Sequence, residues 1–254
     1  MGTFYNSNHP LISHLSRDLV FGVDYGNPKC LTKSLRRAPK DVGPNGVVFT
    51  DIGTPLGHAK TTSTFISYTR YKDNTLQTHD YSNGFSFVAI CSVDKSGTNM
   101  FQDGGIIGSG TTTTSHFFNF GLKRTGIGFY LWHKITNAAG NGTVYTQSNY
   151  QNDEFPEVDD DKIFMVGMSH SISSLTFYAH GLPIDTKSIS SSINTTYPDF
   201  SGNSWATVSG HGWQSGSERF HKEGKIFMVY AYKRPLTNAD HLSFFNTFKN
   251  RYNL

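Results

Sequence analysis

The stretch GKIFMVYAYKRPLTNADHLSFFNTFKNRYNL (residues 224–254) decides the fold class, because a strand pattern passes directly into a helix pattern in it. Its first ten residues are rich in β-branched and aromatic side chains, which favour strands. Pro235 ends that strand. Thr237 and Asp240 then have the spacing of a capping box at the start of a helix. The sequence therefore predicts a strand, a short corner and a C-terminal helix in succession.

The predicted helix has one apolar side. Leu242, Phe245 and Phe248 or Tyr252 recur at helical spacing. We expect this face to pack on the edge of a β-sandwich.

Upstream of residue 224 the chain reads almost entirely as strands and turns. In GFSFVAICSV (residues 84–93), alternate residues form two sets, and both sets contain apolar side chains. A strand with two partly apolar faces is predicted to be central in a sandwich. One set consists of Phe85, Phe87, Ala89, Cys91 and Val93. Residues 162–184 are predicted to form paired strands that lead to a His-Gly turn.

The pentapeptide KIFMV occurs twice, at residues 162–166 and 225–229. Each copy is predicted to be a strand with Phe and Val on one face and Ile and Met on the other. Further copies at a fixed period are absent from the sequence, which excludes a solenoid.

About a dozen short strands separated by turn signals predict an all-β protein, a two-sheet antiparallel jelly-roll sandwich with a short C-terminal helix. Nothing in the composition marks a boundary between domains. We expect residues 18–254 to form a single domain. Residues 1–17 have few periodic apolar positions and are expected to form an N-terminal arm.

Three stretches resemble a known family in their order and spacing. They are LVFGVDYGNPKC (residues 19–30), KIFMVGMSHSISSLTFYAHGLPIDT (residues 162–186) and the closing residues 224–254. Together they resemble the concanavalin A-like lectin/glucanase superfamily of laminin-G-like jelly rolls, in its phage-encoded structural type. The resemblance implies two packed antiparallel sheets, one of them concave. It implies no single activity, because members include lectins, glycosidases, adhesion modules and virion proteins.

Composition narrows the choice of partners. Charged residues make up 16% of the chain, its net charge is +3, and no Lys/Arg block is longer than the pair Arg36-Arg37. These values argue against a nucleic-acid-binding surface. No stretch approaches the roughly 20 apolar residues of a membrane span, and the N-terminus has no apolar leader, so we expect neither membrane insertion nor secretion. Cys91 is expected to be a buried free thiol, although a Cys30–Cys91 disulfide stays open.

Candidate catalytic and metal-binding groups are sparse. The resemblance implies that a glycosidase of this superfamily carries Glu-x-Asp-x-x-Glu on a concave strand, and the nearest match begins at Glu157 and Asp159 but has Lys162 in place of the third acid. No zinc motif and no Gly-x-Ser-x-Gly motif is present, so we interpret the chain as a non-enzyme that needs no cofactor. Weak candidates for calcium ligands form one acidic run, Asp159, Asp160 and Asp161.

Four aromatic residues are candidate platforms for sugar rings. Trp205 and Trp213 lie in a Gly/Ser-rich region, and Tyr130 and Trp132 share one face of a predicted strand. The preferred interpretation of each is a core or sheet-surface aromatic.

The leading hypothesis is a non-enzymatic virion structural protein of a tailed bacteriophage, located on the capsid or tail after assembly in the host cytoplasm. Its expected partners are other virion proteins and further copies of the same chain, with the arm of residues 1–17 as a plausible anchor. The alternative is a glycan-binding module that attaches the particle to a host-surface glycan, with multivalency supplying affinity. A glycoside hydrolase is the third hypothesis.

Overall fold

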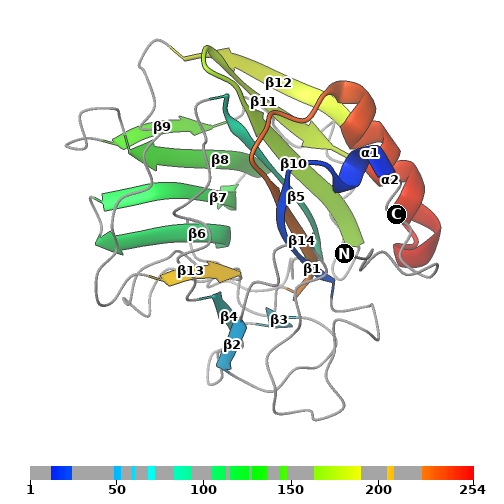
Figure 1. Ribbon diagram of the computed structural model, residues 1–254, viewed down its shortest axis with the longest axis horizontal. Helices are drawn as coiled ribbons and strands as arrows, with labels where there is room; N and C mark the ends of the chain where they lie inside the picture. The colour runs from blue at the N-terminus through cyan, green and yellow to red at the C-terminus, as the bar shows by residue number, and fades with distance from the viewer. Residues whose placement is uncertain are drawn as a thin grey trace.

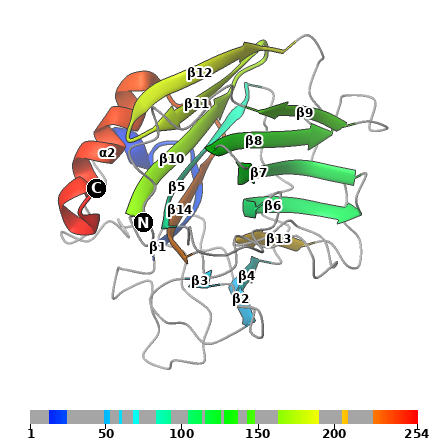
Figure 2. The ribbon, with the colours of Figure 1, turned by 180° about the vertical axis from the view of Figure 1, so that it is seen from behind.

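The computed structural model of the 254-residue chain describes residues 13–24, 49–52, 59–60, 68–71, 83–92, 104–112, 115–125, 128–136, 143–147, 163–189, 205–208 and 225–254. They form two seven-stranded sheets and two helices, and every strand pairing is antiparallel. Figures 1 and 2 show the sheets as two layers whose strands run across one another.

The first sheet has the spatial order β1 (Leu19–Asp24), β14 (Lys225–Tyr232), β5 (Phe85–Ser92), β10 (Ile163–His170), β11 (Ser174–Ala179) and β12 (Leu182–Ser188), with β3 (Ala59–Lys60) also pairing with β14. The second has the order β2 (Phe49–Ile52), β4 (Tyr68–Tyr71), β13 (Trp205–Val208), β6 (Gly104–Thr112), β7 (Ser115–Thr125), β8 (Gly128–Thr136) and β9 (Thr143–Gln147). The helices are α1 (Ser13–Ser16) and α2 (Asn238–Tyr252). The predicted all-β sandwich with a C-terminal helix is confirmed.

Strand β5 lies in the middle of the first sheet, as predicted, and all eight of its residues are buried. One side of β5 faces the second sheet, where the ring of Phe87 stacks on that of Phe120 of β7 at 6.3 Å. On the other side, Ser86 bonds to the segment that leads into α2. A strand covered on both sides needs apolar residues in both alternating sets, which explains its sequence.

The predicted hairpin and its turn are also present. Strand β10 pairs with β11, and β11 pairs with β12 through the two-residue turn His180-Gly181. The φ angles of these residues are 47° and 81°, the left-handed values that a type I′ hairpin turn requires. A Cβ atom at Gly181 would lie 2.8 Å from the Phe245 Cβ atom, so glycine also lets α2 approach the turn.

The two KIFMV copies are not equivalent, contrary to the prediction. In β10, Phe164 lies opposite Cys91 and Met165 opposite Ile90. In β14 a bulge occurs between Ile226 and Met228, so that Ile226 takes the position opposite Cys91. The extra residue shifts the alternation by one, and Ile and Met no longer share a face.

The helix α2 covers the outer face of the first sheet, on the side away from the second sheet (Figures 1 and 2). The prediction that it would pack on the sandwich edge was wrong. The predicted apolar face was correct at Phe248 and Tyr252, which are buried, but Leu242 is 41% exposed and the buried face continues through His241 and Phe244 instead. The predicted capping box is confirmed, and the helix ends at Asn253 in the left-handed conformation.

The predicted arm of residues 1–17 is described only from residue 13. There the chain forms the four-residue helix α1, and Leu15 is fully buried in the core. Among the described residues, no helix is long and apolar enough to cross a membrane. Cys91 is a buried free thiol, as predicted, and burial raises the pKa of this thiol well above its usual range. Cys30 lies outside the described residues.

Candidate functional site

Several predicted site residues fall outside the described part of the chain. Trp213 is one of them, as are the candidate calcium ligands Asp159, Asp160 and Asp161 and the carboxyl group of Glu157. Among the residues that the structure describes, no group of three or more His, Cys, Asp or Glu side chains could hold a metal ion.

The remaining candidate aromatics belong to the second sheet but lie far apart. Tyr130 and Trp132 are in β8, where they alternate with the buried Leu131 and His133. Trp205 begins β13, and β6 and β7 lie between β13 and β8.

The register of the strands gives the distance between Trp132 and Trp205. Trp132 pairs with Gly121, which pairs with Gly105, whereas Trp205 pairs with Gly110 of the same strand β6. Three strand spacings and five residues along a strand amount to about 20 Å. The described backbone therefore places Trp132 and Trp205 at two separate positions on this sheet.

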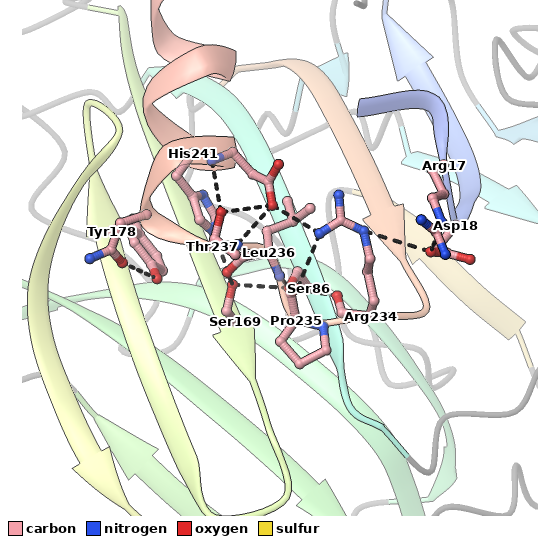
Figure 3. Close-up of polar contacts among 12 residues, drawn as sticks. Arg17, Asp18, Ser86, Ser169, Tyr178, Arg234, Pro235, Leu236, Thr237 and His241 are labelled. Atoms are coloured by element: carbon pink, nitrogen blue, oxygen red, sulfur yellow. Dashed lines mark hydrogen bonds and ion pairs between the residues drawn. The ribbon is translucent and has the colours of Figure 1, made fainter. Parts of the chain in front are cut away.

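The most connected polar group in the described structure lies between the first sheet and α2 (Figure 3). We call Ser86, Ser169 and His241 the docking cluster. The Ser169 hydroxyl lies 2.8 Å from the Leu236 carbonyl oxygen, 2.9 Å from His241 Nε2 and 3.0 Å from the Ser86 hydroxyl. The backbone N–H of Leu236 donates to Ser86 Oγ at 2.7 Å. Two strands and the helix entry thus share one set of hydrogen bonds.

These contacts restrict where the protons can lie. A hydroxyl has one proton, so if Ser169 donates to the Leu236 carbonyl, His241 Nε2–H donates to Ser169 Oγ. Ser86 accepts from Leu236 N–H, and its single proton faces both the Arg234 carbonyl at 2.9 Å and Ser169 Oγ at 3.0 Å. This arrangement gives every hydroxyl in the docking cluster both a donor and an acceptor role, and it makes His241 a neutral Nε2–H imidazole.

The His241 ring is held flat against Tyr178. Their centroids are 3.6 Å apart with an interplanar angle of 15°, and the Tyr178 hydroxyl donates to Asn238 of α2 at 2.9 Å. Burial lowers the pKa of His241 to about 3; Asp240 acts against this shift and Arg234 adds to it. The imidazole therefore stays neutral at physiological pH.

A serine hydroxyl beside a histidine is also the arrangement of a catalytic nucleophile and its base. Here the pair lacks the other parts of such a site. His241 Nδ1 has no hydrogen-bond partner among the described residues, so no carboxylate orients the ring there. Ser169 is only 6% exposed and lies beneath α2, where no substrate can reach it. In the described structure the pair holds the helix in place.

An ionic cluster holds the corner before α2. Arg234 Nη1 donates to Asp240 Oδ2 at 2.8 Å, and Arg234 Nε lies 3.7 Å from Asp18 Oδ2. The Thr237 backbone N–H also donates to Asp240 at 2.9 Å. Burial alone would raise the pKa of Asp240, but the bonds from Arg234 and Thr237 outweigh it and lower that pKa.

The other end of α2 is tied to β1. Asp24 is fully buried, and it accepts from Arg251 Nη1 and from the Tyr252 hydroxyl, each at 2.7 Å. Basic residues in the last turn also stabilise the helix dipole. Strands β1 and β14 are the first and last in the sequence and neighbours in the sheet. They are thereby also linked through the helix that follows β14.

Two further histidines, one from each sheet, form a contact that joins the two sheets. His133 Nε2 of β8 lies 3.2 Å from His170 Nδ1 of β10, and the rings meet edge to face at 5.2 Å. Phe85 of β5 packs on both rings, at 5.6 Å and 5.1 Å. Burial lowers the pKa of His170 to about 4. We call His133 and His170 the inter-sheet histidine pair.

Sequence reasoning missed the docking cluster and the inter-sheet histidine pair. A signal was present, because Ser169 and His170 end the otherwise apolar run IFMVGMSH of β10. Polar side chains in a strand that is buried on both faces must find partners, but the sequence does not name partners that lie far away along the chain.

The comparison with solved structures supports the fold. No protein-family model and no curated protein matches the chain. The binding domain of Paraclostridial Mosquitocidal Protein 1 is similar in structure, with a TM-score of 0.61 and 12% identity over 93% of this chain and 53% of that one. The binding domain of Botulinum neurotoxin DC in complex with rat synaptotagmin II has a TM-score of 0.62 and 12% identity over 92% of this chain and 52% of that one.

A third structure, the same neurotoxin binding domain in complex with SialylT, gives a TM-score of 0.62 with 13% identity over 92% of this chain and 52% of that one. The chain thus spans about half the length of these solved structures. At such low identity the likeness shows the fold alone, a β-sandwich also found in toxin binding domains. Membership of the concanavalin A-like superfamily stays a prediction.

Proposed function

We propose that this chain is a non-enzymatic binding module whose sandwich presents a recognition surface for a receptor or glycan. The observation that carries the proposal is the structural match over 91–93% of the chain to binding domains of toxins. One of these binding domains is in complex with rat synaptotagmin II and another with SialylT. The burial of the Ser169–His241 pair supports the same conclusion, because the most enzyme-like contact in the described residues has a structural role.

The second sheet is the better location for such a surface. The outer face of the first sheet is covered by α2, so β5, β10 and β14 offer no exposed face there. The aromatic candidates Tyr130, Trp132 and Trp205 all belong to the second sheet. Aromatic side chains bind glycans by stacking on the sugar rings, so a host-surface glycan is the ligand that we propose. Display of the module in several copies would raise a weak affinity.

An array of glycans and receptor ectodomains, probed with a multimerised form of the whole chain, tests this proposal. We expect binding that falls at least about tenfold in Trp132→Ala or Trp205→Ala, equivalent to about 1.4 kcal/mol. Leu242→Ser is the matched control, because Leu242 is an exposed apolar residue on α2, in the opposite layer. An absence of any bound ligand would refute the module, and equal loss in the control would refute the location.

A structural role in a phage particle is the second candidate, supported by the resemblance of LVFGVDYGNPKC (residues 19–30) to phage-encoded members. Its anchor would be the segment before the folded domain. Because Leu15 is buried, the deletion that tests the anchor removes residues 1–12 and spares α1. We expect a folded protein that no longer enters particles; incorporation at normal copy number would contradict this role.

A further inference from the structure

The inter-sheet histidine pair is the polar contact that links the two layers in the described core. His133 is 2% exposed and His170 is fully buried. Their rings are 3.2 Å apart at Nε2 and Nδ1, so one of these nitrogens donates and the other accepts. Such a bond requires that at least one of the two facing nitrogens carries no proton.

In the part of the chain that the structure describes, no group beside His170 compensates a charge on it. His170 Nε2 is buried and has no hydrogen-bond partner among the described residues. The neighbouring strands place Phe85 of β5 and Leu175 of β11 opposite His170. Among the described residues, His133 of β8 is the titratable group that faces His170, and the ionised pair Arg234–Asp240 lies with α2 at the opposite face of the sheet.

Protonation therefore acts on the contact between the layers. A doubly protonated His170 would carry a proton on Nδ1 and an unpartnered N–H on Nε2 in apolar surroundings. A doubly protonated His133 would lose its acceptor at Nε2, and so could bond only to an unprotonated His170 Nδ1. Separation of the layers at this end lets water solvate either charge.

We propose that the inter-sheet histidine pair is an acid-sensitive contact, and that mild acidification opens the sandwich locally where β8 of the second sheet meets the ends of β5 and β10. The inference goes beyond the proposed binding function and does not depend on the ligand. It concerns a local opening of the layers and leaves the docking of α2 intact.

The size of the effect follows from linkage. The opened state titrates with the ordinary pKa of 6.5 and the closed state with a pKa of about 4 at His170. Between pH 7 and pH 5, preferential protonation of the opened state raises the opening equilibrium by roughly 20-fold.

Amide hydrogen exchange of the full chain at pH 7 and pH 5, corrected for the intrinsic rate at each pH, measures this opening. We expect the amides of residues 85–87 and 169–170 to lose protection by roughly 20-fold at pH 5. His170→Asn keeps a hydrogen-bonding nitrogen or oxygen near the Nδ1 position but does not titrate. In this variant we expect less than a twofold change.

His241→Gln is the matched control, because it removes a second buried histidine at the opposite face of the sheet and keeps a donor to Ser169. The variant should retain the 20-fold response. If His170→Asn does not fold, His170→Phe takes its place, since a ring there can pack on Phe85. A wild-type change below threefold, a full response in the His170 variant, or its loss in His241→Gln would each overturn the proposal.

Discussion

At the residue scale, the structure depends on a glycine and a hydroxyl that lie two positions apart in β10. Gly167 lets the His241 ring approach the sheet, since a Cβ atom at residue 167 would lie 2.7 Å from His241 Cε1 and 3.2 Å from the Phe87 carbonyl oxygen. Ser169 then receives His241 Nε2 at 2.9 Å. Gly167, which has no side chain, and Ser169, which has a short polar one, together determine the distance between α2 and the sheet.

Gly167→Ala is therefore expected to lift the imidazole and lower the free energy of unfolding by about 2–3 kcal/mol, through overpacking. Urea denaturation of the single variant, of His241→Ser and of the double variant forms a double-mutant cycle. Removing the ring relieves the clash, so the double variant should lose less than the sum of the singles by at least about 1 kcal/mol. Additive losses would show that the alanine disturbs the strand and not the helix.

Ser169→Ala is expected to leave the Leu236 carbonyl and His241 Nε2–H without a partner. Each buried group left unpaired costs about 1–3 kcal/mol, so the variant should be destabilised by at least about 2 kcal/mol in thermal or urea unfolding. Thr176→Ala, which removes the exposed hydroxyl contact to Thr186, is the control and should cost less than about 0.5 kcal/mol. Equal losses in the two variants would contradict the role of the docking cluster.

Two buried imidazoles with strongly lowered pKa values, those of His170 and His241, also predict how stability depends on pH. The pKa of His241 is lowered to about 3 and that of His170 to about 4, whereas both return to about 6.5 on unfolding. The unfolded state therefore binds protons first as the pH falls below 6.5. Each histidine should lower the free energy of unfolding by up to about 1.4 kcal/mol per pH unit until its folded-state pKa is reached.

Urea midpoints at pH 7, 6 and 5 measure this slope. His241→Gln removes one buried imidazole with a lowered pKa, and the slope should then fall by the part that His241 contributes, up to about 1.4 kcal/mol per pH unit. An unchanged slope in the variant, or a flat wild-type profile, would contradict the neutral buried imidazoles.

At the element scale, α2 shows what sequence reasoning can and cannot provide. Thr237 and Asp240 sit three residues apart and identified the helix start, because capping chemistry is local. The buried face was partly misplaced because Leu242 and Phe245 have the same spacing as His241 and Phe244. Only the partners distinguish them: Phe244 meets Tyr230 and Tyr232 of β14, and these contacts cannot be seen in a helical wheel.

In the strands, too, local features were predicted and features that depend on neighbouring elements were not. The alternation in residues 84–93 and the His180-Gly181 turn are local and were predicted correctly. The bulge between Ile226 and Met228 was not, because a bulge depends on the neighbouring strands β5 and β3. For the candidate site, the aromatic residues of β8 and β13 could be named from sequence, but their separation depends on a register that crosses two further strands.

The buried Asp24 gives a prediction for the docking of α2 on β1. Arg251→Met leaves the Asp24 carboxylate with one fewer donor in a fully buried position. We expect a loss of about 3 kcal/mol, and we expect Asp24→Asn in the same chain to recover part of it by removing the charge. Thermal unfolding of the two single variants and the double variant checks this, and a double variant less stable than Arg251→Met alone would contradict it.

At the scale of the whole molecule, each layer has a different task. The central strands β5 and β10 of the first sheet are buried on both faces, by the second sheet and by α2, and their polar residues are used for internal hydrogen bonds. The second sheet carries the aromatic residues that we propose for recognition, so variants that affect binding and variants that affect stability should separate by layer. This division depends on α2 being an integral part of the sandwich.

Native-state hydrogen exchange in increasing urea tests that dependence most directly. We predict that the amides of Phe244 and Phe248 in α2 lose protection together with those of Val88 and Ile90 in β5, in one cooperative transition. Loss of protection in α2 at clearly lower urea, with β5 still protected, would show that the helix is a separable appendage and would contradict the account.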